Sequence, residues 1–337
     1  LTDDAVSITF DVPDDLRDTF TFTPGQHLTI RTELAGDDVR RNYSLCTAPD
    51  PGSLSIGVKR LHGGAFSEHA LSVLKVGDLL EVMPPTGRFG LVVDPNAARH
   101  IGLVAAGSGI TPLLSIASAV LEGEPDSSVT LIYANRSQNS VMFLEQIEDL
   151  KDRFVGRLNL IHVLSRQPMD ADILSGRLDG DRLQRILEQL VPAPTVDEWY
   201  LCGPLDMVGE LTKTLTAAGA THVHTELFHV EDVAPTRRPP EQFDQGGPVV
   251  TATLDGKTAT IELTPEDDSV LAGLLRVRPD APFACRGGVC GTCRAKVLGG
   301  AVDMRQNYAL EPEEVAAGYV LTCQSWPTSE ALAVSYE

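Results

Sequence analysis

Three different rhythms of apolar and polar positions follow one another along the chain. In the first stretch, short runs rich in Val, Ile, Thr and Phe are separated by turn residues, as at Val6–Phe10, His27–Arg31 and Leu54–Val58. Runs of this kind, broken by Pro, Gly and Asp, are typical of antiparallel strands. With one helix expected around Phe66–Leu74, they predict a small antiparallel β-barrel over residues 1–97.

From His100 onward, apolar strand-like runs alternate with stretches of helical period. This alternation predicts βαβ units and a parallel sheet, which we place at residues 98–230. The expected strands are Ile101–Ala105, Val129–Ala134, Leu158–Leu164, Trp199–Leu201 and Val223–Leu227. The expected helices are Pro112–Leu121, Val141–Phe154, Asp181–Leu190 and Leu205–Ala218.

The alternation stops in a segment rich in Pro, Gly and charged residues, which we interpret as a linker at residues 231–246. A third domain is expected at residues 247–337. It begins with a predicted hairpin, in which Val249–Leu254 and Lys257–Leu263 flank Asp255-Gly256. A helix is expected to begin at Thr264-Pro265, because Thr is a good N-cap and Pro suits the first helical position.

Composition and charge narrow the classes of function. The 337 residues are 42% hydrophobic, which suffices for ordinary cores, and no apolar run is long enough to span a bilayer. A net charge of −20 opposes binding to phosphate backbones and to anionic membranes, so we expect neither nucleic acid nor membrane as a partner. The sequence begins at Leu1 rather than Met, and its first residues do not resemble a targeting peptide, so we expect a cytoplasmic protein.

Four of the six cysteines give the strongest chemical signal. Cys285, Cys290 and Cys293 follow the spacing C-x4-C-x2-C, and Cys323 is a distant fourth, which is the plant-type spacing for a 2Fe–2S cluster. Thiolates are soft ligands that suit iron–sulfur centres, and the glycines of the loop let the backbone fold closely around inorganic sulfide. The alternative is structural zinc, which usually shows two C-x2-C pairs, whereas only one is present here.

A glycine-containing turn in the second domain predicts a phosphate site. Gly107-Ser108-Gly109-Ile110-Thr111-Pro112 follows an apolar strand and leads into a helix, so its backbone amides can face a phosphate. Pro112 stands where the dinucleotide fingerprint has its third Gly. The next strand ends in Asn135-Arg136-Ser137 rather than in a carboxylate, and Arg forms charge-assisted bonds to phosphate. We therefore favour NADPH over NADH; the alternative is that Arg136 is a solvated loop residue.

Two motifs in the first domain are compatible with a flavin. In Arg41-Asn42-Tyr43-Ser44, the Tyr43 ring can stack on a planar ring, Arg41 can neutralise a pyrophosphate, and Ser44 can bond to a ring nitrogen. The turn Gly63-Gly64-Ala65-Phe66-Ser67 opens the expected helix and can supply a second phosphate contact. Each motif alone is weak, because an Arg and a Tyr on a strand are usually surface and core residues.

The order of the motifs resembles one family. The sequence is similar, over essentially its whole length, to the ferredoxin–NADP reductase superfamily with a fused C-terminal plant-type ferredoxin. The motifs that carry this resemblance, in chain order, are Arg41–Ser44, Gly107–Pro112, Cys202-Gly203-Pro204 and the cysteine loop. Finer features resemble the reductase components of phenylacetyl-CoA epoxidases, and reductases of steroid-ring hydroxylases share much of the pattern. These features are Pro24–Leu28, Tyr133–Arg136, Asn307–Pro312 and Gly318–Gln324.

The resemblance implies an FAD-binding barrel, a Rossmann-like NADP-binding domain and a β-grasp 2Fe–2S domain. It implies catalytic roles at the reacting rings for Tyr43, Ser44, Thr111, Cys202, Glu226 and Phe228. It implies cofactor contacts for Arg41, Asn42, Tyr43, Ser44, Val58, Lys59, Gly64, Phe66, Ser67, Gly107, Ser108, Gly109, Thr111, Pro112, Asn135, Arg136, Ser137, Cys202, Gly203 and Pro204. One departure is Ala65, where relatives often carry a basic or larger residue, and it puts one FAD phosphate contact in doubt.

These expectations define an electron-transfer reductase that passes electrons from NADPH to FAD and on to the 2Fe–2S cluster. A plant-type cluster has a potential near about −400 mV, low enough to supply an oxygen-activating metal centre, so an oxygenase is the expected acceptor. The first hypothesis is a phenylacetyl-CoA epoxidase, and the alternative is a Rieske-type ring or steroid hydroxylase. A hypothesis of another class, a redox-sensing iron–sulfur protein, lacks a DNA-binding element in the sequence.

Several other features have simpler explanations. We interpret His222 and His224 as packing or hydrogen-bonded residues rather than half of a metal site, and Cys46 as a small core residue. The acidic stretches Glu266-Asp267-Asp268 and Glu311–Glu314 are interpreted as first turns of helices, where carboxylates complement the helix dipole, rather than as docking sites for an oxygenase.

Overall fold

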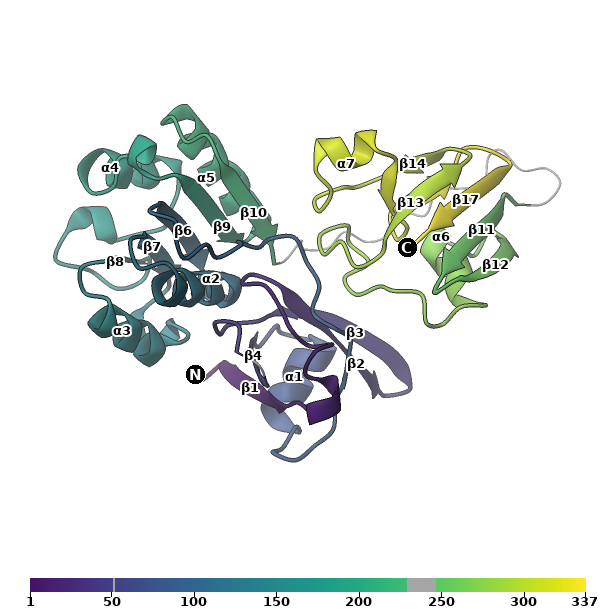
Figure 1. Ribbon diagram of the computed structural model, residues 1–337, viewed down its shortest axis with the longest axis horizontal. Coiled ribbons are helices and arrows are strands. Elements are labelled where there is room, and N and C mark those ends of the chain that lie inside the picture. Colours follow the sequence, from purple (N-terminus) through teal and green to yellow (C-terminus); the bar gives the residue numbers. More distant parts are fainter. Residues whose placement is uncertain (51, 229–246) are drawn as a thin grey trace. The chain divides into compact units, whose positions relative to one another are not determined.

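The computed structural model describes residues 1–50, 52–228 and 247–337, and the chain divides into two compact units, Leu1–His229 and Val230–Glu337. The first unit holds both of the first two expected domains, and the second unit holds the third (Figure 1). The expected linker at 231–246 lies outside the described residues. Among the described helices, none combines the length and apolar character that crossing a bilayer requires.

An antiparallel β-barrel forms the first part of unit 1. Its strands are β1 (Ala5–Asp11), β2 (His27–Leu34), β3 (Asp37–Ser44), β4 (Ser53–Lys59) and β5 (Glu81–Val82). Strand β1 pairs with β4, β2 lies between β3 and β5, and a bridge from Leu45 to Ile56 joins the two groups. Leu28, Ile30 and Val58 are fully buried in the barrel core, which α1 (Ala65–Ser72) closes through Phe66.

Five parallel strands build the second part of unit 1, as the alternating pattern predicts. They are β6 (His100–Ala106), β7 (Ser128–Asn135), β8 (Leu158–Leu164), β9 (Glu198–Gly203) and β10 (Val223–Leu227), in the spatial order β10-β9-β6-β7-β8. The chain leaves β6 towards β7 and returns on the other side at β9. The carboxyl ends of β6 and β9 therefore flank a topological switch point, where open α/β sheets bind ligands.

Four helices cover the two faces of this sheet (Figure 1). They are α2 (Ile110–Gly123), α3 (Leu144–Arg153), α4 (Gly180–Gln189) and α5 (Leu205–Ala217). Apolar residues of α2 and α3 belong to one buried cluster, and those of α4 and α5 belong to another. Short 3-10 turns lie at Asp14–Leu16, Gly107–Gly109, Gln138–Ser140, Asp172–Leu174 and Ala193–Thr195.

The helix expected from Val141 begins three residues later, at Leu144. Its N-cap residue Phe143 has φ 58°, a left-handed conformation that interrupts the helix, and its ring is buried against the barrel. A Cβ on Gly57 of β4 would lie 2.9 Å from Cε2 of Phe143 and 2.7 Å from Cγ2 of Thr111. The barrel and the sheet thus touch through a glycine, and burying Phe143 at this junction outweighs the helical pattern of the sequence.

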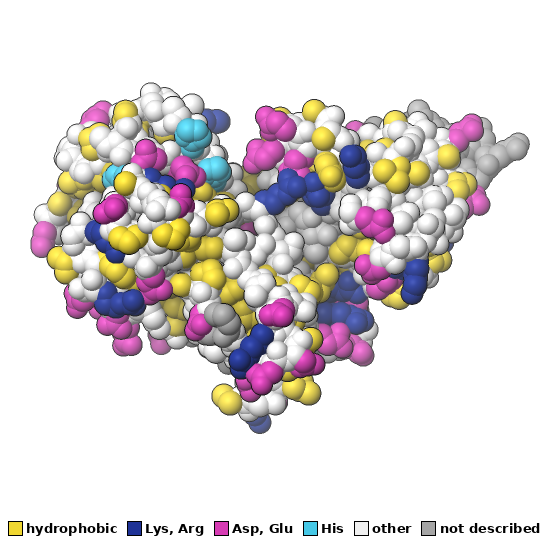
Figure 2. All heavy atoms as spheres, viewed as in Figure 1, with side chains coloured by type: hydrophobic (Ala, Val, Ile, Leu, Met, Phe, Trp, Pro, Cys, Tyr) yellow, Lys and Arg dark blue, Asp and Glu magenta, His cyan; other side chains and the backbone are white. Residues whose placement is uncertain are grey.

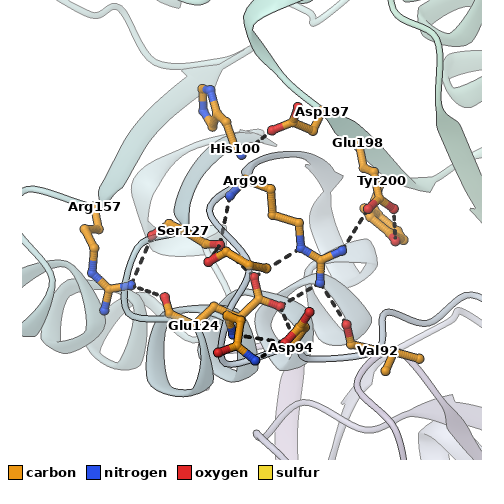
Figure 3. A network of polar contacts seen from close by, with 12 residues as sticks. Val92, Asp94, Arg99, His100, Glu124, Ser127, Arg157, Asp197, Glu198 and Tyr200 are labelled. Carbon is orange, nitrogen blue, oxygen red and sulfur yellow. Dashed lines mark hydrogen bonds and ion pairs between the residues drawn. The ribbon is translucent and has the colours of Figure 1, made fainter.

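A buried ion-pair network joins the ends of several elements in unit 1 (Figure 3). The carboxylate of Glu124 is fully buried and accepts bonds from Arg99 (Nη2–Oε1 2.6 Å; Nε–Oε2 3.1 Å), from Ser127 (2.7 Å) and from the Asp94 amide (3.1 Å). Arg99 also pairs with Glu198 at 2.9 Å. Burial opposes the ionisation of Glu124, but these bonds outweigh it and lower its pKa. The negative charge of Glu124 is therefore compensated by Arg99 and by hydrogen bonds, at the point where the chain passes from the barrel into the sheet.

Unit 2 is built on a mixed sheet with the order β12-β11-β17-β13-β15, and a separate pair is formed by β14 and β16. The strands are β11 (Val249–Leu254), β12 (Lys257–Glu262), β13 (Arg294–Gly299), β14 (Val302–Met304), β15 (Tyr319–Leu321), β16 (Ser325–Pro327) and β17 (Ala331–Ser335). The expected hairpin is confirmed, with Asp255 (φ 51°) and Gly256 (φ 68°) both left-handed, as a two-residue type I′ turn requires.

The helix expected at Thr264-Pro265 is wrong. Helix α6 spans Val270–Leu275, and its N-cap is Ser269, whose Oγ accepts a bond from the Ala272 amide at 3.2 Å. The Thr264 amide instead donates to Oδ2 of Asp267 at 2.8 Å, which closes a turn. The buried Asp267 carboxylate accepts hydrogen bonds from the amide and the hydroxyl of Thr264, and the backbone therefore turns here instead of entering a helix.

The two acidic stretches therefore differ. Asp267 also pairs with Arg276 at 2.9 Å and does not belong to a helix, so its interpretation as part of a first turn is corrected. The stretch Glu311–Glu314 does lead into a helix, α7 (Pro312–Ala316), and forms a capping box in which Glu314 also binds Arg294 at 2.8 Å. Over the visible face of the molecule, acidic side chains are scattered rather than gathered in one patch (Figure 2).

Candidate functional site

The turn Gly107–Pro112 lies at the switch point of the sheet, against Cys202-Gly203-Pro204. A Cβ on Gly109 would lie 2.1 Å from the carbonyl oxygen of Cys202, so only glycine permits this contact. Gly107 has φ 53°, and nothing lies within 4 Å of where its Cβ would stand. A ligand can therefore approach the backbone of the turn closely, and the start of α2 favours a phosphate there. The structure brings these two expected motifs together.

A cluster of acid and hydroxyl groups lies beside that turn. Ser44 ends β3 and its hydroxyl donates to Oε2 of Glu226 on β10 at 3.2 Å. The Cys202 thiol lies 4.0 Å from the same oxygen. The Glu226 side chain is 16% exposed, and burial raises its pKa to about 8. Burial also raises the pKa of Cys202, so its thiol stays neutral. A carboxyl group whose pKa lies near neutrality can hold or release a proton at working pH.

Tyr43 lies on strand β3 of the barrel and directly precedes Ser44, a member of this cluster. Its partly buried ring packs at 5.3 Å from the Phe66 ring, and burial raises the pKa of its phenol. Phe66 itself is a core residue of the barrel. Arg41 is exposed, with Nη1 donating to the Arg40 carbonyl at 2.7 Å. An aromatic ring with an adjacent exposed guanidinium fits a flavin and its pyrophosphate.

Other residues expected at the flavin are engaged elsewhere. The Ser67 hydroxyl is buried and accepts a bond from the Leu61 amide at 3.0 Å, so this turn offers a phosphate its backbone rather than that hydroxyl. Val58 points into the barrel core, and Lys59 pairs with Asp4 at 3.5 Å. The Asn42 amide bonds to residues of β2 rather than pointing outward.

The end of β7 carries the expected nucleotide-selecting residues. Arg136 is exposed, and neither its side chain nor that of Arg166 has an ion pair within the described parts of the chain. The Arg166 amide donates to the Arg136 carbonyl at 2.7 Å, so the two exposed arginines are neighbours across β7 and β8. Asn135 is only 8% exposed, and its Nδ2 lacks a hydrogen bond among the described residues. Ser137 caps the following turn with Ser140.

The remaining nucleotide-side residues also lie at this edge. Thr111 is buried in the first turn of α2, and its hydroxyl donates to the Ser108 carbonyl at 3.1 Å. Phe228 is partly buried, and its amide donates to the Gly203 carbonyl at 3.2 Å, which holds the chain after β10 against the end of β9. Sequence reasoning assigned no role to Arg166 or to His27, although His27 lies within the recognised Pro24–Leu28 motif.

In unit 2, the four expected cluster cysteines fall into two pairs. Cys285 and Cys290 interact through their thiols, as do Cys293 and Cys323. Contact with Cys290, backed by loop amides, lowers the pKa of Cys285 to about 6, and contact with Cys293 lowers that of Cys323. No set of three or more ligands among the described residues converges on a single metal ion. The structure therefore brings together the four cysteines whose spacing predicts a 2Fe–2S cluster.

The backbone around these thiols supplies hydrogen-bond donors. The Gly287 amide donates to Sγ of Cys285 at 3.3 Å, and Nε2 of Gln324 donates to Sγ of Cys323 at 3.7 Å. The same Gln324 amide donates to the Arg286 carbonyl at 2.6 Å, which ties the loop to the fourth ligand. Gly288 takes φ 79°, which lets the loop turn back on itself. These residues fit a 2Fe–2S cluster, and the amides would tune its potential.

The contacts of Cys46, His222 and His224 agree with their interpretation as packing or hydrogen-bonded residues. Cys46 is buried in an apolar cluster, and its thiol donates to the Ser55 carbonyl at 3.2 Å. His224 stacks on Tyr200 with ring centroids 4.6 Å apart and lies 3.4 Å from Glu198, and His222 bonds to Thr221.

Three family models match successive parts of the chain. Residues 1–90 match an oxidoreductase FAD-binding domain, residues 103–213 match an oxidoreductase NAD-binding domain, and residues 252–328 match a 2Fe-2S iron-sulfur cluster binding domain. The expected barrel, parallel-sheet and ferredoxin architecture is thereby confirmed, and so are FAD, a nicotinamide nucleotide and a 2Fe–2S cluster as cofactors.

Individual relatives extend over the whole chain. The sequence is 42% identical over 338 residues to a subunit of 1,2-phenylacetyl-CoA epoxidase from Escherichia coli K12, covering 100% of this chain and 94% of that protein. It is 33% identical over 348 residues to the ferredoxin reductase component of 3-ketosteroid-9-alpha-monooxygenase from Rhodococcus rhodochrous, covering 99% and 93%. The fold matches phthalate dioxygenase reductase with a TM-score of 0.58 and 24% identity, over 99% of this chain and 94% of that one.

A further solved structure, an intact type IV self-sufficient cytochrome P450 monooxygenase, matches with a TM-score of 0.68 and 25% identity, over 99% of this chain and 39% of that one. The three matched domains, their order and the full-length relatives agree with the geometry of both sites. The chain belongs to the family of flavin- and iron–sulfur-dependent oxidoreductases that includes the matched phenylacetyl-CoA epoxidase protein and other oxygenase reductase components.

Proposed function

We propose that this chain is the NADPH-dependent reductase component of an oxygenase, and that its acceptor is a phenylacetyl-CoA epoxidase. Support for the acceptor comes from the relative named as part of that epoxidase, which is 42% identical and matches end to end. The relative named for a steroid monooxygenase, at 33% identity, keeps the second hypothesis open. Neither relative's name favours a redox-sensing role, because each is named as part of an enzyme system.

The proposed chemistry assigns each part of unit 1 a task. The barrel would hold a flavin, which would supply two-electron acceptance of hydride and one-electron release to a 2Fe–2S cluster. The Gly107–Pro112 turn would hold the nucleotide phosphates, and the close Gly109–Cys202 contact would leave room for the nicotinamide end beside Cys202. Ser44 and Glu226 would hold a proton next to the flavin, since the Glu226 carboxyl has a pKa of about 8.

The preference for NADPH rests on the neighbouring exposed arginines at the ends of β7 and β8. Two guanidinium groups without an ion pair among the described residues can bind a 2′-phosphate, and an arginine–phosphate bond is charge-assisted and directional. No carboxylate is present at Asn135–Ser137 to bind the ribose hydroxyls of NADH.

The test is anaerobic reduction of the purified protein by NADPH or NADH, followed through its flavin and iron–sulfur absorption. In Arg136→Ala, and in Arg166→Ala, we expect the KM for NADPH to rise about 10- to 100-fold, the loss of one hydrogen bond to a charged group, with NADH affected less than about twofold. The control is Arg153→Ala, an exposed arginine that pairs with Glu122 on the outer helices. Equal losses with both nucleotides would contradict the assignment.

The acceptor is tested separately. The reduced protein is mixed with the purified oxygenase component of a phenylacetyl-CoA epoxidase and, in parallel, with a Rieske-type steroid hydroxylase. We expect reoxidation coupled to product formation only with the epoxidase. Coupling to the hydroxylase instead would replace the acceptor while leaving the nucleotide assignment intact.

A further inference from the structure

A chain of hydrogen-bonded side chains, two of them buried, leads from β2 and β3 towards the Ser44–Glu226 pair. Thr29 on β2 and Asn42 on β3 face each other in register, and the Thr29 hydroxyl donates to Oδ1 of Asn42 at 2.7 Å. The other end of the amide, Nδ2 of Asn42, lies 2.9 Å from Nε2 of His27. Thr29 is fully buried and His27 is 4% exposed, so bulk water does not replace these partners.

The amide polarity determines which imidazole nitrogen carries the proton. In the amide orientation of this structure, Nδ2 of Asn42 faces Nε2 of His27 and donates to it, so Nε2 accepts and has no hydrogen. Burial lowers the pKa of His27 to about 4, so the ring is neutral at physiological pH and its single proton must be on Nδ1. Thr29 stabilises this orientation of the amide, because its hydroxyl satisfies the oxygen end.

The protonated edge of the ring faces the carboxyl group. Nδ1 of His27 lies 3.9 Å from Oε1 of Glu226, beyond a hydrogen bond but within electrostatic reach. Gly87 closes the space beside it, since a Cβ at Gly87 would lie 2.9 Å from Nδ1. The imidazole therefore has little freedom to turn its other edge towards Glu226.

Ser44, Cys202 and His27 surround the carboxyl group of Glu226. Ser44 on β3 donates to one carboxyl oxygen, and Cys202 on β9 is a neutral thiol. No lysine or arginine in the described parts of the chain forms an ion pair with Glu226. On its own strand, His224 is occupied with Glu198. An N–H pointing at Glu226 favours its ionised form, whereas a ring lone pair in the same place would disfavour it.

We propose that Thr29 and Asn42 are positioning residues that hold His27 in its Nδ1–H tautomer facing Glu226, and that they thereby support ionisation of this carboxyl group. The inference rests on the proposed function of the same site and deepens it, because it explains how a proton position beside the flavin is tuned by side chains that bond to one another within the barrel.

The tautomer is measured directly in the full-length holoprotein. Histidine is labelled with 15N, long-range proton–nitrogen spectra are recorded near neutral pH, and the His27 signals are identified by their loss in His27→Gln. We expect a protonated Nδ1 and an unprotonated Nε2 in the wild type. An Nε2–H tautomer, or a doubly protonated ring, overturns the proposal.

Isosteric variants then test the hydrogen bonds that link Thr29, Asn42 and His27. Asn42→Asp replaces the donor with an acceptor, so the proton should move to Nε2 and the lone pair should face Glu226. Thr29→Val removes the hydroxyl without changing charge and should give a mixture of tautomers, and Thr29→Ser should restore the wild-type spectrum. Thr32→Val on the same strand is the control, because Thr32 makes no side-chain hydrogen bond among the described residues. An unchanged tautomer in Asn42→Asp refutes the positioning role.

The second readout is the pH dependence of flavin reduction by NADPH. We expect its inflection to shift to higher pH in Thr29→Val and further in Asn42→Asp, and to return in Thr29→Ser. If the tautomers change as expected but no inflection exists, the role proposed for Glu226 in the reaction fails while the positioning chain stands. A wild-type profile in both Thr29→Val and Asn42→Asp, despite a changed tautomer, overturns the coupling to Glu226.

Discussion

The pKa of the Glu226 carboxyl group is set by its neighbours in the folded protein. Its hydrogen-bond partner comes from β3 and its thiol neighbour from β9, so its environment exists only after the barrel and the sheet have packed together. Burial raises its pKa from 4.5 to about 8. The folded protein therefore binds a proton that the unfolded chain has released, and stability must fall as pH rises between these two values.

This sign gives a residue-scale prediction. Glu226→Gln, which cannot titrate, should be as stable as the wild type near pH 4.5 and more stable by a few kcal/mol at pH 8 and above, since one unit of pKa is about 1.4 kcal/mol. Urea unfolding of the holoprotein, followed by flavin fluorescence across pH, measures the difference. The same variant should lose the pH inflection of flavin reduction. A stability difference that does not depend on pH would contradict the shifted pKa.

At the scale of elements, the switch point depends on a close approach of two backbones. Gly109 ends the 3-10 turn after β6, and the Cys202 carbonyl at the end of β9 occupies the space of a Cβ, 2.1 Å away. A backbone carbonyl cannot move aside as a flexible side chain does. Any side chain at Gly109 must therefore displace the phosphate-binding turn from the end of β9.

We predict that Gly109→Ala weakens binding of NADP⁺ at least about tenfold while FAD remains bound, because the barrel contacts are untouched. Titration calorimetry measures the affinity, and the flavin spectrum reports FAD content. Gly156→Ala is a matched control in the same domain, since nothing lies within 4 Å of its Cβ position. Wild-type affinity in Gly109→Ala would mean that this contact does not set the nucleotide site.

Most strands lie where the sequence predicts them, but two helices begin later than predicted because of tertiary contacts. The expected strands of the sheet and the hairpin of unit 2 are present, because alternating or continuous apolar runs settle which residues leave water. The starts of α3 and α6 were displaced by Phe143 and Asp267, which find tertiary partners in the barrel and in Arg276. The partner of Phe143 lies far away in the sequence, so no local signal reveals it. Asp267 binds Thr264 and Arg276, which are near in sequence but meet it only in the folded turn.

For the whole molecule, the division into two compact units predicts that the two halves of the electron path can be separated by a single substitution. Cys323→Ser removes one ligand of the buried Cys293–Cys323 pair in unit 2 and leaves unit 1 unaltered. We expect loss of the iron–sulfur absorption and of acceptor reduction, with NADPH-driven reduction of ferricyanide kept within about twofold.

The control is Cys46→Ser, which replaces a buried core thiol of unit 1 that bonds to the Ser55 carbonyl. It should retain iron, flavin and electron transfer. Simultaneous loss of flavin reduction in Cys323→Ser would show that the two units depend on each other for folding.

The sequence by itself determined the architecture and the cofactor types, and it predicts four cysteines as the cluster ligands. The periodicity of apolar residues shows which side chains become buried on folding, and this predicts the architecture. Cysteine spacing and glycine-rich turns involve only a few neighbouring residues, so they can be recognised in the sequence alone. Only the tertiary structure decided the surroundings of Glu226, the pairing of Arg166 with Arg136 at the sheet edge, and the Thr29–Asn42–His27 chain. These depend on strand register and on barrel–sheet packing, which join residues up to 182 positions apart, as in the Ser44–Glu226 bond.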